Sequence, residues 1–172
     1  MMISDIKQIK RIVEGALMAS SGESLSIDDF AKLLEDGNKI EIKEIQNILN
    51  ELSDDYAGHG IELKQVASGY RFQVCADLGK WISKLWQEKP TRYSRALLET
   101  LALIAYRQPI TRAEIENVRG VSVSTNIIRT LMEREWIKIA GHKDVPGKPA
   151  LYITTRKFLD YFNLQSIKEL PV

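Results

Sequence analysis

The sequence lacks the features that would place the chain in a membrane or in an oxidising compartment. It contains no run of about 18 apolar residues. Its N-terminal stretch MMISDIKQIKRIVEG mixes charged with apolar residues, which is not the pattern of a secretory signal peptide. Cys75 is the single cysteine, so the chain can form neither an internal disulfide nor a CxxC motif. We therefore expect a cytoplasmic protein without a membrane span.

The residue patterns of catalysis are also missing. His59 and His142 lie far apart in the sequence, and neither is accompanied by the spaced ligands of a zinc site. No GxxxxGK[ST] stretch offers a cradle for a nucleotide phosphate. Cys75 follows a predicted strand, where a buried structural thiol is commoner than a nucleophile. We expect no enzymatic activity, no metal and no cofactor.

Charge is distributed unequally along the chain, although the net charge of the whole is only +1. Residues 1–88 carry 10 Lys and Arg against 15 Asp and Glu, whereas residues 89–172 carry 14 against 8. The first part is therefore acidic, with a net charge of −5, and the second is basic, with a net charge of +6. This asymmetry, with the proline-bearing stretch QEKPTRYS between the parts, predicts two domains with different roles, 1–88 and 89–172.

The same order of elements is predicted in both parts. In the first, helical periodicity over about 5–20, 26–37 and 41–56 precedes alternating strands on either side of Ser68-Gly69. Ser26 is the predicted N-cap of the second of these helices. A packed closing helix is then expected over about 77–86, because Leu78, Trp81, Ile82, Leu85 and Trp86 share one arc.

In the second part, helices are predicted over 94–106, after Thr111 and over about 122–135. Thr111 and Glu114 form a predicted capping box at the start of the second of these helices. Strands at 136–140 and 151–154 then flank a loop with a Pro146-Gly147 turn, and a closing helix follows in RKFLDYFNL. Three helices followed by a hairpin form a winged helix. The predicted fold is mainly α with small β-hairpin wings, an α+β arrangement of tandem winged-helix domains.

The helix within LETLALIAYRQ is apolar on more than one side. One stripe contains Leu97, Leu98, Leu101, Ile104 and Ala105, and Ala102, Leu103 and Tyr106 remain opposite. A second apolar face requires a second surface to cover it. Two explanations stay open: intramolecular packing against the closing helix or the first domain, and docking of a partner at Leu103 and Tyr106.

Nucleic acid is the alternative partner for a winged helix. The third helix of the first part presents mostly carboxylates, which would repel phosphates. The third helix of the second part exposes Asn126 and Arg129, residue types that read bases. Arg107 and Arg112 add charge beside the apolar helix. We take Leu103, Tyr106, Arg107, Arg112 and Arg129 as candidate partner-binding residues, with a DNA-binding transcriptional regulator as the alternative function.

Three segments resemble one protein family. ETLALIAYRQPITRAEIENVRGVS, DVPGKPALYITTRKFLDYFNL and the ending IKELP are similar to the bacterial segregation and condensation protein B (ScpB) family. The chain differs from the usual family pattern at Glu135, His142 and Lys148.

This resemblance implies a non-enzymatic subunit that forms homodimers through its first domain. It also implies binding to the kleisin ScpA, which bridges the SMC protein in the chromosome-condensing complex. The expected location is the cytoplasm, in association with the nucleoid, with DNA contacted only indirectly or weakly.

Overall fold

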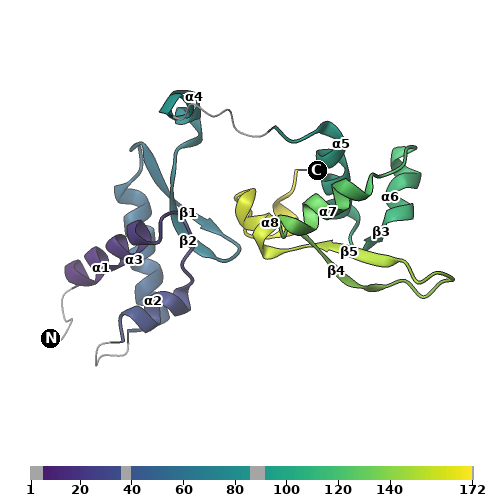
Figure 1. The fold of residues 1–172 in the computed structure, drawn as a ribbon. Helices are drawn as coiled ribbons and strands as arrows, with labels where there is room; N and C mark the ends of the chain where they lie inside the picture. Colours follow the sequence, from purple (N-terminus) through teal and green to yellow (C-terminus); the bar gives the residue numbers. More distant parts are fainter. Residues whose placement is uncertain (1–5, 36–39, 86–91, 172) are drawn as a thin grey trace. The chain divides into compact units, whose positions relative to one another are not determined.

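The structure is a computed structural model that describes residues 6–35, 40–85 and 92–171. It contains two compact units, Met1–Lys89 and Pro90–Val172, each with its own core (Figure 1). The two units are described separately below.

The first unit begins with three helices and a hairpin. The helices are α1 (Ile6–Ala19), α2 (Ile27–Leu33) and α3 (Ile42–Asp55), and the hairpin pairs β1 (Ile61–Val66) with β2 (Gly69–Val74). Apolar residues at helical spacing form one buried cluster: Ile9, Val13, Leu17, Phe30, Leu34, Ile45, Ile48, Leu49, Leu52 and Phe72. Residue 37, the predicted end of the second helix, lies outside the described residues.

A short bridge connects the start of α2 to the hairpin. The backbone groups of Leu25 and Tyr70 exchange two hydrogen bonds of 2.8 Å. Gly69 lies against this bridge with φ of 147°, and a Cβ atom there would approach the Leu25 carbonyl oxygen to 2.1 Å. Ser26 then caps α2 in a capping box with Asp29. The sequence predicted this cap, whereas the bridge was not predicted.

The predicted closing helix of the first unit is present, but the prediction that it packs on the core is wrong. The segment consists of η1 (Ala76–Leu78), one α-helical turn, α4 (Gly79–Ile82), and η2 (Ser83–Leu85). Trp81 is 63% exposed and Leu85 is 73% exposed, so the shared arc does not pack on the core. The three pieces follow one another without a gap, so the segment is helical throughout and only its hydrogen-bond pattern changes between 3-10 and α. Trp86 lies outside the described residues.

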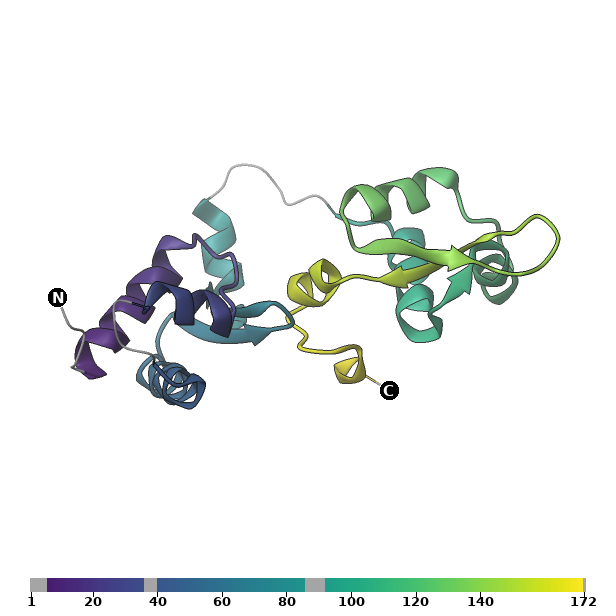
Figure 2. The same cartoon turned by 90° about the horizontal axis from the view of Figure 1, so that it is seen from below.

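The second unit repeats the arrangement and adds a strand. Its helices are α5 (Arg95–Arg107), α6 (Arg112–Arg119) and α7 (Thr125–Glu133), followed by β4 (Ile137–His142), β5 (Ala150–Thr154), α8 (Arg156–Tyr161) and η3 (Ile167–Glu169). The unpredicted β3 (Ile110–Thr111) pairs with β5, giving an antiparallel sheet of order β3-β5-β4. Two residues are too few for a period of two to show in a sequence. Figure 2 shows the loop between β4 and β5 extending beyond the helices of this unit.

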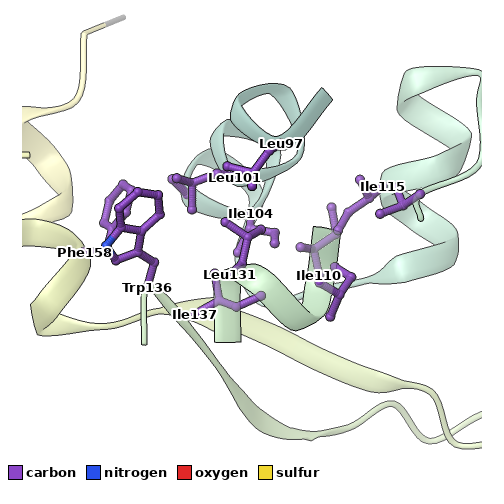
Figure 3. Packing of buried hydrophobic residues seen from close by; sticks show 12 residues of the cluster. Leu97, Leu101, Ile104, Ile110, Ile115, Leu131, Trp136, Ile137 and Phe158 are labelled. Atoms are coloured by element: carbon purple, nitrogen blue, oxygen red, sulfur yellow. The ribbon is translucent and has the colours of Figure 1, made fainter. Parts of the chain in front are cut away.

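The core of the second unit lies between its three helices, the sheet and α8. Leu97, Leu101 and Ile104 of α5 converge with side chains from α7, the strands and α8 (Figure 3). Ile104, Ile115, Val123 and Leu131 are completely buried. This packing fixes one side of α5, so its other side is available for a different role.

The observed architecture confirms the predicted fold class. Both units place three helices before an antiparallel hairpin, as in a winged helix, and the fold is α+β. Within the residues described, no helix combines the length and the apolar character that crossing a membrane requires.

Candidate partner-binding surface

The outer face of α5 carries apolar side chains that the core does not bury. Leu98 is 42% exposed and Tyr106 is 55% exposed, and Ala102 lies between them on the same side of the helix. The prediction that Leu98 belongs to the core stripe is therefore wrong. At about 100° per residue, Leu98 lies at the edge of that stripe, on the side toward Ala102.

An apolar groove runs beside this face. Its volume is about 280 Å³. It is enclosed by α5, by α8 and by the segment that follows α8. The lining residues are Leu98, Leu101, Ala102, Ala105, Tyr106, Phe158, Phe162, Leu164, Leu170 and Pro171. A groove of this size and composition can accept a bulky apolar side chain.

Intramolecular packing accounts for part of the second apolar face. Leu103 is half-buried and packs against the core of the unit, and it does not line the groove. It follows Ala102 by about 100° around the helix, so it points away from the groove side. Phe158 of α8 and Phe162, which directly follows α8, line the groove, in agreement with the explanation by intramolecular packing. Tyr106 lines the groove, and its hydroxyl donates a hydrogen bond to the Pro171 carbonyl.

The candidate arginines occupy different places in the unit. Arg107 is exposed in the last turn of α5, next to Tyr106. Arg112 instead connects α6 to α7: its Nε lies 3.1 Å from Glu116 Oε1, its Nη1 donates to Thr125 Oγ1 at 3.2 Å, and its Nη2 donates to the Val123 carbonyl. Arg112 thus has a structural role that is independent of any partner.

The carboxylate of Glu116 completes this connection. It accepts a hydrogen bond of 2.8 Å from the Val123 backbone N–H. This bond has the largest effect on the pKa of Glu116, and the bond from Arg112 has the next largest. Both lower that pKa below its usual value. The loop before α7 is therefore fixed by charge-assisted bonds.

The third helix of the second unit uses its cations locally. Arg129 donates to Asn126 Oδ1 at 2.6 Å and lies 3.7 Å from Glu133. The Arg134 guanidinium lies 4.8 Å from the centre of the Tyr93 ring, a cation–π distance. Because both arginines have internal partners, reading of bases by α7 would require these contacts to be exchanged for contacts with DNA.

The loop between β4 and β5 is attached to α6 by a charged pair. Lys143 Nζ lies 2.6 Å from Glu114 Oε1. Glu114 also completes the capping box of α6 with Thr111, as predicted. The hydrogen bond from Lys143 has the largest effect, and together with the bonds from Thr111 it holds the pKa of Glu114 at about 2. One carboxylate thus fixes both the helix start and the loop.

The described residues hold no cluster that suggests metal or thiol chemistry. In residues 6–35, 40–85 and 92–171, no group of three His, Cys, Asp or Glu side chains could bind a metal ion. Partial burial is the main cause that raises the pKa of the Cys75 thiol, and the negative charges of Glu62 and Asp77 raise it further. A raised pKa disfavours the nucleophilic thiolate. The Cys75 thiol donates to the His59 carbonyl at 3.3 Å.

Residues 11–172 match the family of the segregation and condensation complex subunit ScpB. The chain belongs to the ScpB family. A segregation and condensation protein B homolog from Coxiella burnetii is 57% identical over 162 residues, which are 94% of this chain and 77% of that protein. This match confirms the predicted family. The ScpB family comprises non-catalytic subunits of the chromosome segregation and condensation complex.

Two solved ScpB structures are also similar. ScpB from Mycobacterium tuberculosis is 31% identical, with 93% of this chain and 98% of that chain covered and a TM-score of 0.43. A dimer of the ScpB N-terminal domain complexed with an ScpA peptide is 26% identical, with 47% of this chain and 98% of that chain covered and a TM-score of 0.43.

Sequence reasoning missed much of the groove. It named Phe158 and Phe162 of the closing helix as one possible cover for the second apolar face, but it gave Leu170 and Pro171 no structural role. The available signal was the row Leu98, Ala102 and Tyr106, which repeats every four residues on one side of α5.

Proposed function

We propose that this chain is a non-enzymatic subunit of the bacterial SMC–kleisin complex that binds the kleisin ScpA through the outer face of α5. It forms a homodimer through the first unit and meets the SMC protein through the kleisin. Its place is the cytoplasm, on the nucleoid. Family membership supports the role in the complex, and a solved ScpB N-terminal domain, which is a dimer complexed with an ScpA peptide, supports the dimer and the ScpA partner. The position of the kleisin site on α5 rests on the groove of the second unit.

The apolar groove beside α5 is the observation that carries the proposed kleisin site. Leu98, Ala102 and Tyr106 line it from one helix, at the spacing that an amphipathic partner segment recognises. A complex is stabilised when a partner removes apolar surface of this kind from water.

Charge favours an acidic kleisin segment at this groove. The part of the chain that contains the groove, residues 89–172, has a net charge of +6. Arg107 is exposed directly after the groove residue Tyr106, and Lys168 is exposed two residues before Leu170. Basic groups beside the apolar groove complement acidic residues that flank an apolar anchor.

Replacing Leu98 with Glu tests the site. Leu98→Glu places a carboxylate in the apolar groove, whereas Val118→Glu changes a residue of similar exposure, 44%, on α6, away from the groove. Both proteins should remain folded dimers by light scattering after gel filtration. Leu98→Glu should weaken the complex with the kleisin of the same organism, whereas Val118→Glu should leave it unchanged. Normal kleisin binding by folded Leu98→Glu would reject this site.

Salt dependence separates this function from that of a DNA-binding regulator. Binding driven by phosphate contacts weakens steeply as salt rises, whereas an apolar protein interface is much less sensitive. Tight DNA binding with a steep salt slope, together with no complex with the kleisin, would favour the regulator.

A further inference from the structure

The segment after α8 folds back onto the groove. We call residues 163–171 the strap. Asn163 adopts a left-handed φ of 57°, and the Leu164 N–H donates to the Leu159 carbonyl at 2.8 Å, which ends α8. The strap then forms the single turn η3, and the Glu169 carboxylate accepts a hydrogen bond of 3.0 Å from the Gln165 N–H.

Side chains, rather than a backbone ladder, hold the strap in place. Leu164, Ile167 and Leu170 are half-buried against the core of the second unit. Within the described chain, the backbone–backbone hydrogen bonds recorded for 165–171 are local, from Glu169 to Ser166 and from Leu170 to Ile167. A segment attached in this way can open without breaking a helix or a sheet.

The end of the strap lies on the outer face of α5. The Tyr106 hydroxyl donates to the Pro171 carbonyl, although the two residues are 65 positions apart. Leu164, Leu170 and Pro171 line the same groove as Leu98, Ala102 and Tyr106. The strap therefore covers apolar surface at the Tyr106 end of α5 and leaves the groove open beside it.

We propose that the strap is a displaceable occupant of the outer face of α5, which competes with the partner segment that binds there. This inference rests on the proposed kleisin site. A partner helix that follows the row from Leu98 to Tyr106 meets Leu170 and Pro171, so it must displace them to use the whole face. The apparent affinity for the partner is then the intrinsic affinity multiplied by the fraction of molecules whose strap is open.

Two changes loosen the strap to different degrees. Truncation after Gln165 removes Ile167, Leu170 and Pro171 but keeps Leu164, whose N–H ends α8. Tyr106→Phe removes one hydrogen bond and keeps the ring in the groove. Tyr161→Phe is the matched control, because it removes a tyrosine hydroxyl of the same unit that bonds to Tyr93 rather than to the strap.

The test measures kleisin affinity by titration calorimetry for the full chain and each variant, after thermal unfolding has shown that each is folded. If the strap is open in about a tenth of the molecules, truncation should tighten binding about tenfold, and Tyr106→Phe should tighten it less. Tyr161→Phe should bind like the unmodified chain. Hydrogen exchange of the Glu169 and Leu170 amides should quicken in the kleisin complex.

The outcomes separate the strap from the kleisin site. Equal or weaker kleisin binding by the folded truncation would overturn the strap proposal alone, because the kleisin site would still be occupied. Binding by the truncation but not by the full chain would support complete self-occlusion. Failure of both to bind kleisin would overturn the proposed function and the competition that depends on it.

Discussion

Replacement of Glu114 tests how the second unit fixes its loop and its second helix at once. The Glu114 carboxylate accepts hydrogen bonds from the Thr111 N–H at 2.8 Å and the Thr111 hydroxyl at 2.7 Å, and it pairs with Lys143 at 2.6 Å. Glu114→Ala removes all three interactions. Glu114→Gln retains an acceptor for Thr111 and removes the charge that attracts Lys143.

The magnitudes follow from these contacts. Loss of the capping interaction costs about 1 kcal/mol. The Lys143 pair adds about 0–1 kcal/mol, because the side chains of Lys143 and Glu114 are 45% and 40% exposed and water screens their attraction. We expect Glu114→Ala to lower the free energy of unfolding of the second unit by about 1–2 kcal/mol. Glu114→Gln should lower it by about 0–1 kcal/mol, which is the contribution of the ion pair alone.

The pH dependence has a definite sign. The pKa of Glu114 falls from 4.5 to about 2 on folding, so the unfolded chain binds more protons than the folded one between these values. The stabilisation from ionised Glu114 is therefore fully present above pH 4.5 and is lost as the pH falls toward 2. The difference in stability between the unmodified chain and Glu114→Gln should shrink as the pH is lowered from 6 to 3.

The assay is urea unfolding followed by Trp136 fluorescence. Trp136 is 3% exposed in the core of the second unit, and the other tryptophans, Trp81 and Trp86, are replaced by Phe in all proteins compared. Lys143→Met in the same background gives the contribution of the ion pair by a double-mutant cycle. Parallel pH profiles of the unmodified chain and Glu114→Gln between pH 6 and 3 would refute the reasoning.

Other predictions concern packing in each unit. Gly69→Ala should destabilise the first unit by more than about 2 kcal/mol, measured by thermal unfolding, because its Cβ would collide with the Leu25 carbonyl. Gly15→Ala is the contrast: no atom lies within 4 Å of its added Cβ in α1, so it should stabilise by about 0.5–1 kcal/mol, and a loss of stability would contradict this. Leu131→Ala should lower the free energy of unfolding of the second unit by about 2–5 kcal/mol in the Trp136 assay, and a change below about 1 kcal/mol would show that the core readjusts around the cavity.

The predictable part of the fold is the part set by neighbours in the sequence. The capping boxes at Ser26 and Thr111 depend on residues three positions apart, so the pattern alone located both helix starts. Gly120 adopts φ of 69° after α6, as expected for a glycine at a helix end. Helical periodicity likewise located the long helices, because their buried stripes repeat within two turns.

The rest depended on segments that are distant in the sequence. The bridge between Leu25 and Tyr70 and the strand β3 are each too short to leave a periodic pattern. The arc from Leu78 to Leu85 has helical spacing, but spacing alone does not show whether a core surface is available to cover it, and Trp81 remains exposed. Periodicity indicated a second apolar face on α5, yet the wall formed by Pro171 comes from a contact that no local pattern encodes.

The candidate site was predicted in outline and not in detail. Tyr106 lines the groove, whereas Leu103 packs against the core and Arg112 connects α6 to α7. Whether Arg107 and Arg129 contact a partner stays a prediction. Tyr106 and Leu103 differ because successive residues of an α-helix are rotated by about 100°. Ala102 therefore faces the groove while Leu103, the next residue, points away from it.

The hydrogen bond between Tyr106 and Pro171 has a practical consequence for work on this protein in cells. A fluorescent reporter or purification tag joined to the chain close to Pro171 would lie next to the carbonyl that contacts α5. With a displaceable strap, as proposed, a fusion at this place changes how often the strap opens, and a localisation or pull-down experiment then reports on a perturbed molecule. A label at the exposed loop residue Val145, away from the groove, leaves that contact intact.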